Sequence, residues 1–166
     1  MGTKLQFSAR SRIEACADDL FEWHSEPGAL ERLTPPWEPI EVEQPSPGIR
    51  DGDRGSLRVP LGPFRVRWVF EHRDYVEGRQ FRDIQISGPF HSWEHTHLFT
   101  PDGPGACILE DRVEYELPLG AVGKFLGSWF VHRKLEKLFA YRHRVTAQAM
   151  AVHKEREPSL KPGLEV

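Results

Sequence analysis

The sequence predicts an α+β domain in which a curled antiparallel sheet of about seven strands wraps around one long C-terminal helix. Before residue 118, apolar and polar residues alternate over short segments that are joined by turns containing Gly or Pro. Two short helical patterns follow the first of these segments, and one helical pattern of about 30 residues ends the series. Strands joined by short turns pair antiparallel, and the twist of that many strands curls the sheet.

The N-terminal part contains the first strand and both short helices. Apolar side chains favour the odd positions of residues 4–13, which indicates a strand with one buried face. Residues 15–25 change to helical spacing, with acidic residues in the first turn. Residues 29–33 are expected to form a second short helix. This helix ends before the Pro35-Pro36 pair, because proline disfavours helical backbone in the residue before it.

The remaining strands and the long helix complete the domain. Period-two patterning and turn residues predict strands at 40–43, 54–60, 64–75, 80–87, 93–99 and 107–117. The long helix runs from about Gly120 to His153. Its apolar stripe includes Trp129, Phe139 and His143, and residues such as Phe130 widen the stripe. This order is the helix-grip arrangement. Because one helix cannot fill a curled sheet evenly, we expect a cavity between the sheet and the helix.

Composition restricts the class of protein. With 166 residues, we expect one domain over 1–154 and a flexible tail over 155–166. A net charge of −3 without a long basic run argues against nucleic acid as a partner. No window approaches about 18 apolar residues, so we expect no stable membrane insertion. The N-terminal residues do not have the pattern of a secretory leader, and two cysteines do not indicate a disulfide framework. We therefore expect a cytoplasmic protein.

Polar and aromatic residues of matching parity on consecutive strands form the candidate site. They are Asp83 on one strand, Trp93, His95, His97 and Phe99 on the next, and Asp111 and Tyr115 on the last. Trp68 from an earlier strand and Phe139 from the long helix would add apolar walls. Parity does not decide which face is concave. The opposite face, with residues such as Glu94 and Thr96, is more polar and suits solvent better.

Several interpretations of this patch stay open. The first is a satisfied polar network that fixes strand register, and the second is a binding site that orients an apolar ligand. The third is a catalytic site in which His95 or His97 acts as a general acid or base beside Asp83 or Asp111. His95-x-His97 with one carboxylate also has the composition of a metal site. We nevertheless expect neither a metal nor a cofactor here. On the long helix, His143 is read as an ordinary helix residue, or as a partner of the acidic strand 110–116.

Local motifs add a family resemblance. They are Leu33-Thr-Pro-Pro-Trp37, Asp51-Gly52, Phe81-Arg-Asp83, Gly88-Pro-Phe-His-Ser-Trp93, His95-Thr-His97, Asp111-Arg-Val-Glu-Tyr115 and Phe139-Ala-Tyr-Arg-His143. Together they resemble a bacterial branch of the START-like (SRPBCC) superfamily that is labelled cell-division-inhibitor-like or polyketide-cyclase-like. The resemblance implies a hydrophobic tunnel for a small or lipid-like ligand. Members of that branch also occur fused to epimerase-like domains, so an epimerase- or reductase-like protein is a possible partner in trans.

We therefore expect the chain to bind a small, largely hydrophobic ligand. Trp68, Trp93, Phe99 and Phe139 would form the walls, and the His, Asp and Tyr side chains would orient the polar end of the ligand. The alternatives are a polyketide cyclase/dehydratase- or isomerase-like enzyme that uses a cavity histidine, and a protein-interaction module whose cavity is vestigial.

Overall fold

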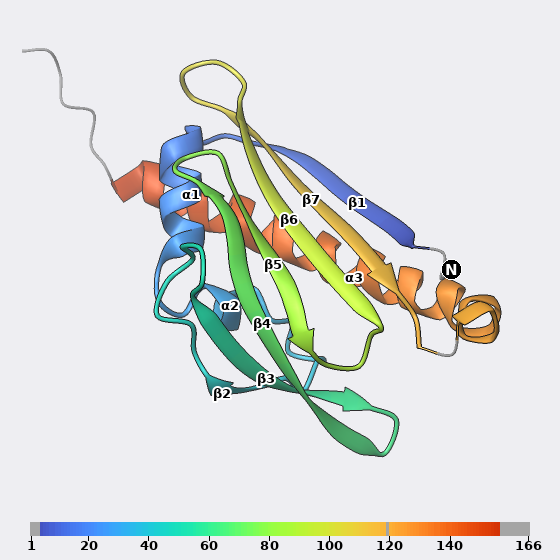
Figure 1. Cartoon of the computed structure of the whole chain (residues 1–166). Coiled ribbons are helices and arrows are strands. Elements are labelled where there is room, and N and C mark those ends of the chain that lie inside the picture. Colours follow the sequence, from blue (N-terminus) through green and yellow to red (C-terminus); the bar gives the residue numbers. More distant parts are fainter. Residues whose placement is uncertain (1–3, 119, 157–166) are drawn as a thin grey trace, which may run out of the picture.

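The computed structural model describes residues 4–118 and 120–156, with residues 120–126 and 155–156 as backbone only, and it has the expected helix-grip architecture (Figure 1). The strands are β1 (Leu5–Ile13), β2 (Glu41–Gln44), β3 (Arg54–Leu61), β4 (Phe64–Val76), β5 (Gln80–Ser87), β6 (Ser92–Pro101) and β7 (Cys107–Glu116). The helices are α1 (Ala17–Ser25), α2 (Ala29–Arg32) and α3 (Gly120–Arg156).

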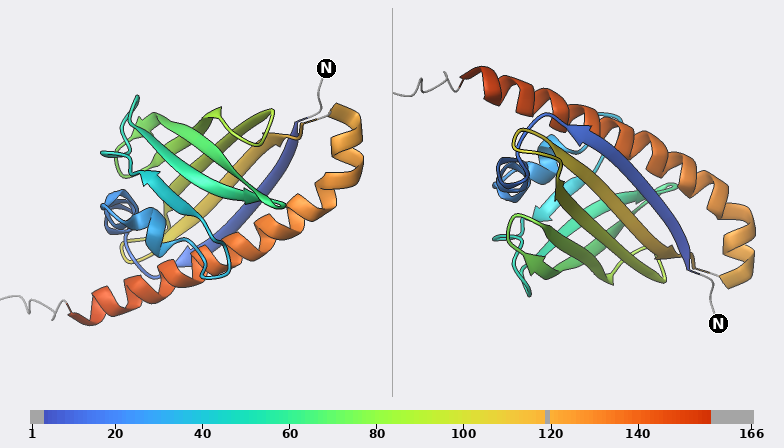
Figure 2. Two further views of the ribbon diagram at one scale, coloured as in Figure 1. Left: turned by 90° about the horizontal axis from the view of Figure 1, so that it is seen from below. Right: turned by 90° about the horizontal axis from the view of Figure 1, so that it is seen from above.

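The seven strands form one antiparallel sheet in the order β1-β7-β6-β5-β4-β3-β2. Strands β2 to β7 are sequential neighbours, as their short connections require, whereas β1 pairs with β7 at the far end of the chain. The sheet is curved but not closed, and α3 lies across its open side (Figure 2). Helices α1 and α2 cover one end of the same side, which leaves the middle of the sheet to α3.

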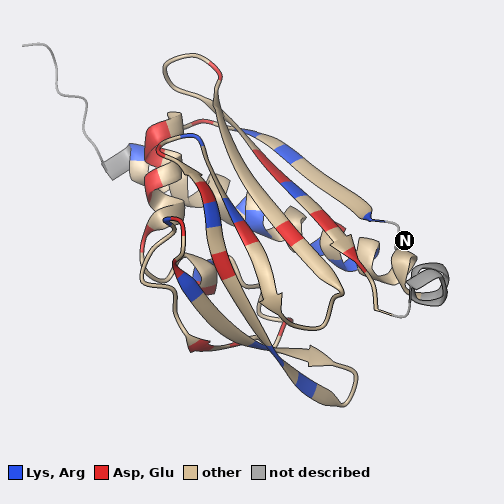
Figure 3. Cartoon of the chain, in the orientation of Figure 1, with Lys and Arg blue, Asp and Glu red and all other residues tan. Residues whose placement is uncertain are grey.

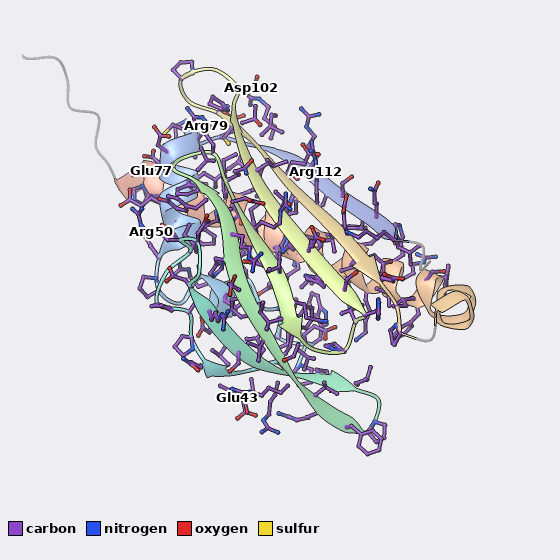
Figure 4. The ribbon with its side chains drawn as sticks, in the orientation of Figure 1. Glu43, Arg50, Glu77, Arg79, Asp102 and Arg112 are labelled. Carbon is purple, nitrogen blue, oxygen red and sulfur yellow. The ribbon has the colours of Figure 1, made fainter. Side chains whose placement is uncertain are left out.

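The outer face of the sheet carries many charged side chains. Acidic and basic residues are mixed along the strands (Figure 3), and several of them pair across strands. Arg82 lies 3.4 Å from Glu94, and Arg67 lies 2.9 Å from Glu43. Figure 4 shows Glu43 and Arg112 among the outward-pointing side chains. The even-numbered face of β5, β6 and β7 therefore faces solvent, and the face with His95 and Asp111 is concave.

Two apolar clusters lie on the concave side. The first lies under α1 and contains Ile13, Leu20, Phe21, Phe81, Phe99 and Leu109. The second lies under α3 and contains Phe7, Val113, Tyr115, Leu135 and Phe139. The histidines of β6 contact both clusters, because His97 stacks on Phe81 with ring centroids 4.1 Å apart and His95 meets the edge of Phe139 at 5.1 Å.

Some details differ from the sequence predictions. Strand β2 begins and ends one residue later than expected, and its pairing with β3 is irregular between Val42 and Gln44. Trp129 is 69% exposed and Phe130 57% exposed, so the predicted stripe is buried only further along α3. Residues 155 and 156 still belong to α3, and the rest of the expected tail, 157–166, lies outside the described residues.

Candidate functional site

Strand register brings the predicted polar residues together on the concave face. Asp83 of β5 is the cross-strand neighbour of His95, and His97 of β6 is the neighbour of Asp111 in β7. Directly opposed residues point to the same side of a sheet with their Cβ atoms about 4.5–5.5 Å apart. Two carboxylates and two imidazoles therefore form one cluster, which we call the His–Asp cluster.

Asp111 is the centre of the cluster and is only 4% exposed. Its Oδ1 accepts a hydrogen bond from His95 Nε2 at 2.8 Å and lies 2.9 Å from His97 Nδ1, while its Oδ2 accepts a hydrogen bond from His143 Nε2 at 2.7 Å. Burial would raise the pKa of the Asp111 carboxyl, but the contacts with His143, His95 and His97 hold it well below its ordinary value. Asp111 is therefore an anion that three imidazoles satisfy.

Asp83 closes the other side of the cluster. Its Oδ2 accepts a hydrogen bond from His97 Nε2 at 3.2 Å and lies 3.7 Å from His95 Nδ1. Its Oδ1 lies 2.6 Å from His72 Nδ1 of β4, without the alignment of a hydrogen bond. Burial would raise the pKa of Asp83, and the proximity of His72 and His97 lowers it below its usual value.

The pKa values of His95 and His97 shift in opposite directions, although the two ring centroids are only 3.9 Å apart. Burial disfavours a charged His97, but its contacts with Asp111 and Asp83 raise its pKa to about 9. For His95, burial and the neighbouring His97 lower the pKa to about 4 against the pull of Asp111. These shifts favour an imidazolium at His97, between two carboxylates, and a neutral ring at His95 near neutral pH.

His143, Ser11 and His72 belong to the site, although the sequence did not assign them to it. The Ser11 hydroxyl of β1 donates to His143 Nδ1 at 2.7 Å, which leaves Nε2–H of the same ring to donate to Asp111. Pairing of His143 with the strand 110–116 was one of the interpretations left open, and the structure identifies Asp111 as its partner. Ser11 and His72 have the inward parity of their strands, so strand parity was the signal that could have found them.

The predicted aromatic residues separate into two groups. Trp68, Trp93 and Tyr115 pack together with Phe90, with ring centroids of Trp68 and Trp93 5.1 Å apart and those of Phe90 and Trp93 4.8 Å apart. Trp68, Phe90 and Trp93 are partly exposed, and Trp68 Nε1 is buried without a hydrogen-bond partner in the described part of the chain. Phe99 instead packs in the core against Phe21 of α1, with centroids 5.3 Å apart.

A groove of about 820 Å³ runs between β1 and α3. Its lining includes Ser11, Phe139 and His143, so it reaches the hydrogen-bonded chain that leads to Asp111. Of the residues predicted to form the cavity walls, only Phe139 lines this groove. The position of the groove therefore differs from the position of the half-buried aromatic group around Trp68.

Solved structures with the same fold are numerous. Norcoclaurine synthase from Thalictrum flavum, in complex with dopamine and hydroxybenzaldehyde, aligns with a TM-score of 0.67 and 17% identity over 92% of this chain and 89% of that chain. A START superfamily protein from Mycobacterium smegmatis aligns with a TM-score of 0.62 and 15% identity over 88% of this chain and 97% of that chain. A nucleoside-diphosphate sugar epimerase from Corynebacterium glutamicum aligns with a TM-score of 0.65 and 23% identity over 86% of this chain, which corresponds to 28% of that chain.

These structural alignments establish a shared fold, and the family comes from a separate comparison. A search of curated proteins finds no significant match. Among the described residues, no helix is both long and apolar enough to cross a membrane. The model of the family described as "polyketide cyclase / dehydrase and lipid transport" matches residues 13–139. The chain belongs to this family, whose START-like, helix-grip fold it has.

Proposed function

We propose that the chain binds a small, largely apolar ligand on the concave side of the sheet. The rings of Trp68, Phe90 and Trp93 would contact the apolar part of the ligand, and the Trp68 N–H would donate to an acceptor on it. The His–Asp cluster would orient the polar end of the ligand. One observation carries the proposal: the Trp68 indole N–H is buried in an aromatic surface and meets no acceptor in the described structure. Buried donors are rarely left unpaired, so an acceptor on a ligand is a natural partner.

The comparisons support the same class of ligand. The family name includes lipid transport, and the norcoclaurine synthase of the same fold was solved with two small aromatic molecules bound. The partly exposed rings in this chain offer stacking surfaces for such a molecule. A location in the cytoplasm agrees with the free thiols of Cys16 and Cys107. The epimerase-like partner in trans stays a prediction.

Native mass spectrometry of the protein purified from its own host tests the proposal. We expect a bound mass that is released under denaturing conditions and that rebinds to the emptied protein. Trp93→Leu should weaken rebinding at least tenfold. The matched control Trp129→Leu should not, because Trp129 is 69% exposed on α3. A protein that neither carries a mass nor binds apolar extracts saturably would refute the proposal.

The enzyme alternative uses the same residues and needs a different readout. Once the ligand is known, His95→Gln and His97→Gln are compared one at a time for binding and for turnover. A catalytic histidine loses turnover while binding persists, whereas an orienting histidine loses affinity first.

A further inference from the structure

We propose that Asp83, His95 and His97 are the protein ligands of a divalent first-row transition-metal ion. One donor atom from each residue lies within 4.8 Å of the other two. Asp83 Oδ2 lies 3.2 Å from His97 Nε2 and 3.7 Å from His95 Nδ1. Ligand atoms about 2.0–2.2 Å from a tetrahedral zinc ion are roughly 3.3–3.6 Å from one another, so the two separations from Asp83 are close to those of donors that share one ion. The donor nitrogens of His95 and His97 lie within 4.8 Å of each other.

The second ring nitrogens of both histidines provide independent support. His95 Nε2 donates to Asp111 Oδ1 at 2.8 Å, and His97 Nδ1 lies 2.9 Å from the same oxygen. Histidines that bind metals almost always direct their other ring nitrogen to a carboxylate or carbonyl, which fixes the tautomer and the ring orientation. Asp111 is itself held by His143, so it is a rigid positioning residue that directs His95 Nδ1 and His97 Nε2 toward Asp83.

His72 lies on the other side of Asp83 and is not one of the three donors. Its Nδ1 is 2.6 Å from Asp83 Oδ1, so this contact occupies Oδ1 and leaves Oδ2 facing His95 and His97. The composition of the cluster alone allowed a metal but did not favour one. What favours it is the arrangement, since three donor atoms converge and a shared carboxylate orients two of them.

The donor set selects the class of ion. Two imidazoles and one carboxylate suit zinc, iron or nickel, whereas calcium and magnesium prefer oxygen donors. Three protein ligands also leave a coordination position open, as in catalytic zinc sites, and a polar group of the proposed apolar ligand would occupy it. The metal site does not depend on that ligand, so it can be tested on the ligand-free protein.

The test uses the full chain without an affinity tag, freed of metal with a chelator and titrated with Zn²⁺ by calorimetry and with Co²⁺ by visible absorption. We expect one ion per chain. Asp83→Asn and His97→Gln should abolish stoichiometric binding, and Asp111→Asn should weaken it about 10–100-fold through loss of positioning. Two control variants should bind normally: His24→Gln, a buried histidine outside the cluster, and His132→Gln, whose exposed ring lies 3.7 Å from Glu136.

A measurement on the unmodified protein covers the case in which a variant fails to fold. Zn²⁺ should shift the imidazole NMR signals of His95 and His97 and leave that of His132 unchanged. The proposal is overturned if the unmodified protein binds no ion stoichiometrically, if folded Asp83→Asn keeps its affinity, or if His132→Gln removes the binding. Absence of an apolar ligand would count against the proposed function alone.

Discussion

Replacement of Phe139 by Ala tests how α3 is held on the sheet. The Phe139 ring is 1% exposed and lies between Phe7, at a centroid distance of 5.4 Å, and His95, at 5.1 Å. A buried Phe removes about 150–250 Å² from water, which at roughly 25 cal/mol per Å² gives an upper value of about 4–6 kcal/mol. Measured Phe→Ala losses in cores are about 3–5 kcal/mol, so we expect a loss of about 4 kcal/mol.

Phe130→Ala is the matched control on the same helix. Phe130 is 57% exposed, and the two positions lie roughly two and a half helical turns apart, on opposite faces. We expect the control to change the unfolding free energy by less than about 0.5 kcal/mol. Urea and thermal unfolding followed by circular dichroism measure both variants, and the midpoint of Phe139→Ala should fall by about 8–16 °C. This orientation of α3 would be refuted if the two variants lost unfolding free energies that differ by less than about 1 kcal/mol.

Three further predictions concern the scaffold. Gly55→Ala should lower the unfolding free energy measured in urea by about 1–3 kcal/mol, because the new Cβ would lie 2.5 Å from the Phe70 ring. The control Gly105→Ala should leave this free energy unchanged, because no atom lies within 4 Å of the new Cβ. Burial lowers the pKa of His24 from 6.5 to about 4, so the unfolded chain takes up the proton first as the pH falls. Relative to His24→Leu, the unmodified protein should therefore lose about 3 kcal/mol of unfolding free energy between pH 6.5 and 4, and equal pH profiles would contradict this. Cys16→Ser should raise the unfolding free energy by about 0.5–1 kcal/mol and with it the thermal midpoint, because the Cys16 thiol is a weak N-cap of α1 that accepts from the Asp19 N–H at 3.4 Å. A lower midpoint would be inconsistent with the cap.

Much of the site follows from strand periodicity. In a strand, side chains alternate between faces, so the parity of Asp83, His95, His97 and Asp111 is compatible with one shared face. Short turns made their strands neighbours, and that was enough to bring these residues together. The expectation for the walls was less complete, because burial depends on what covers a face. Phe99 has the right parity but is enclosed by α1.

The sequence by itself determined the order of elements, the antiparallel sheet and which residues share one face, because these depend on local periodicity and turn chemistry. Which of the two faces is concave came from the tertiary structure. Only the tertiary structure decided which atoms meet. Ser11 and His143 are 132 positions apart, and their contact depends on how α3 is rotated and placed over β1 and β7. That placement completes the partners of Asp111, and Asp111 orients the two histidines that face Asp83. Local patterns carry no information on such long-range geometry, because it is set by the packing of a helix against a sheet.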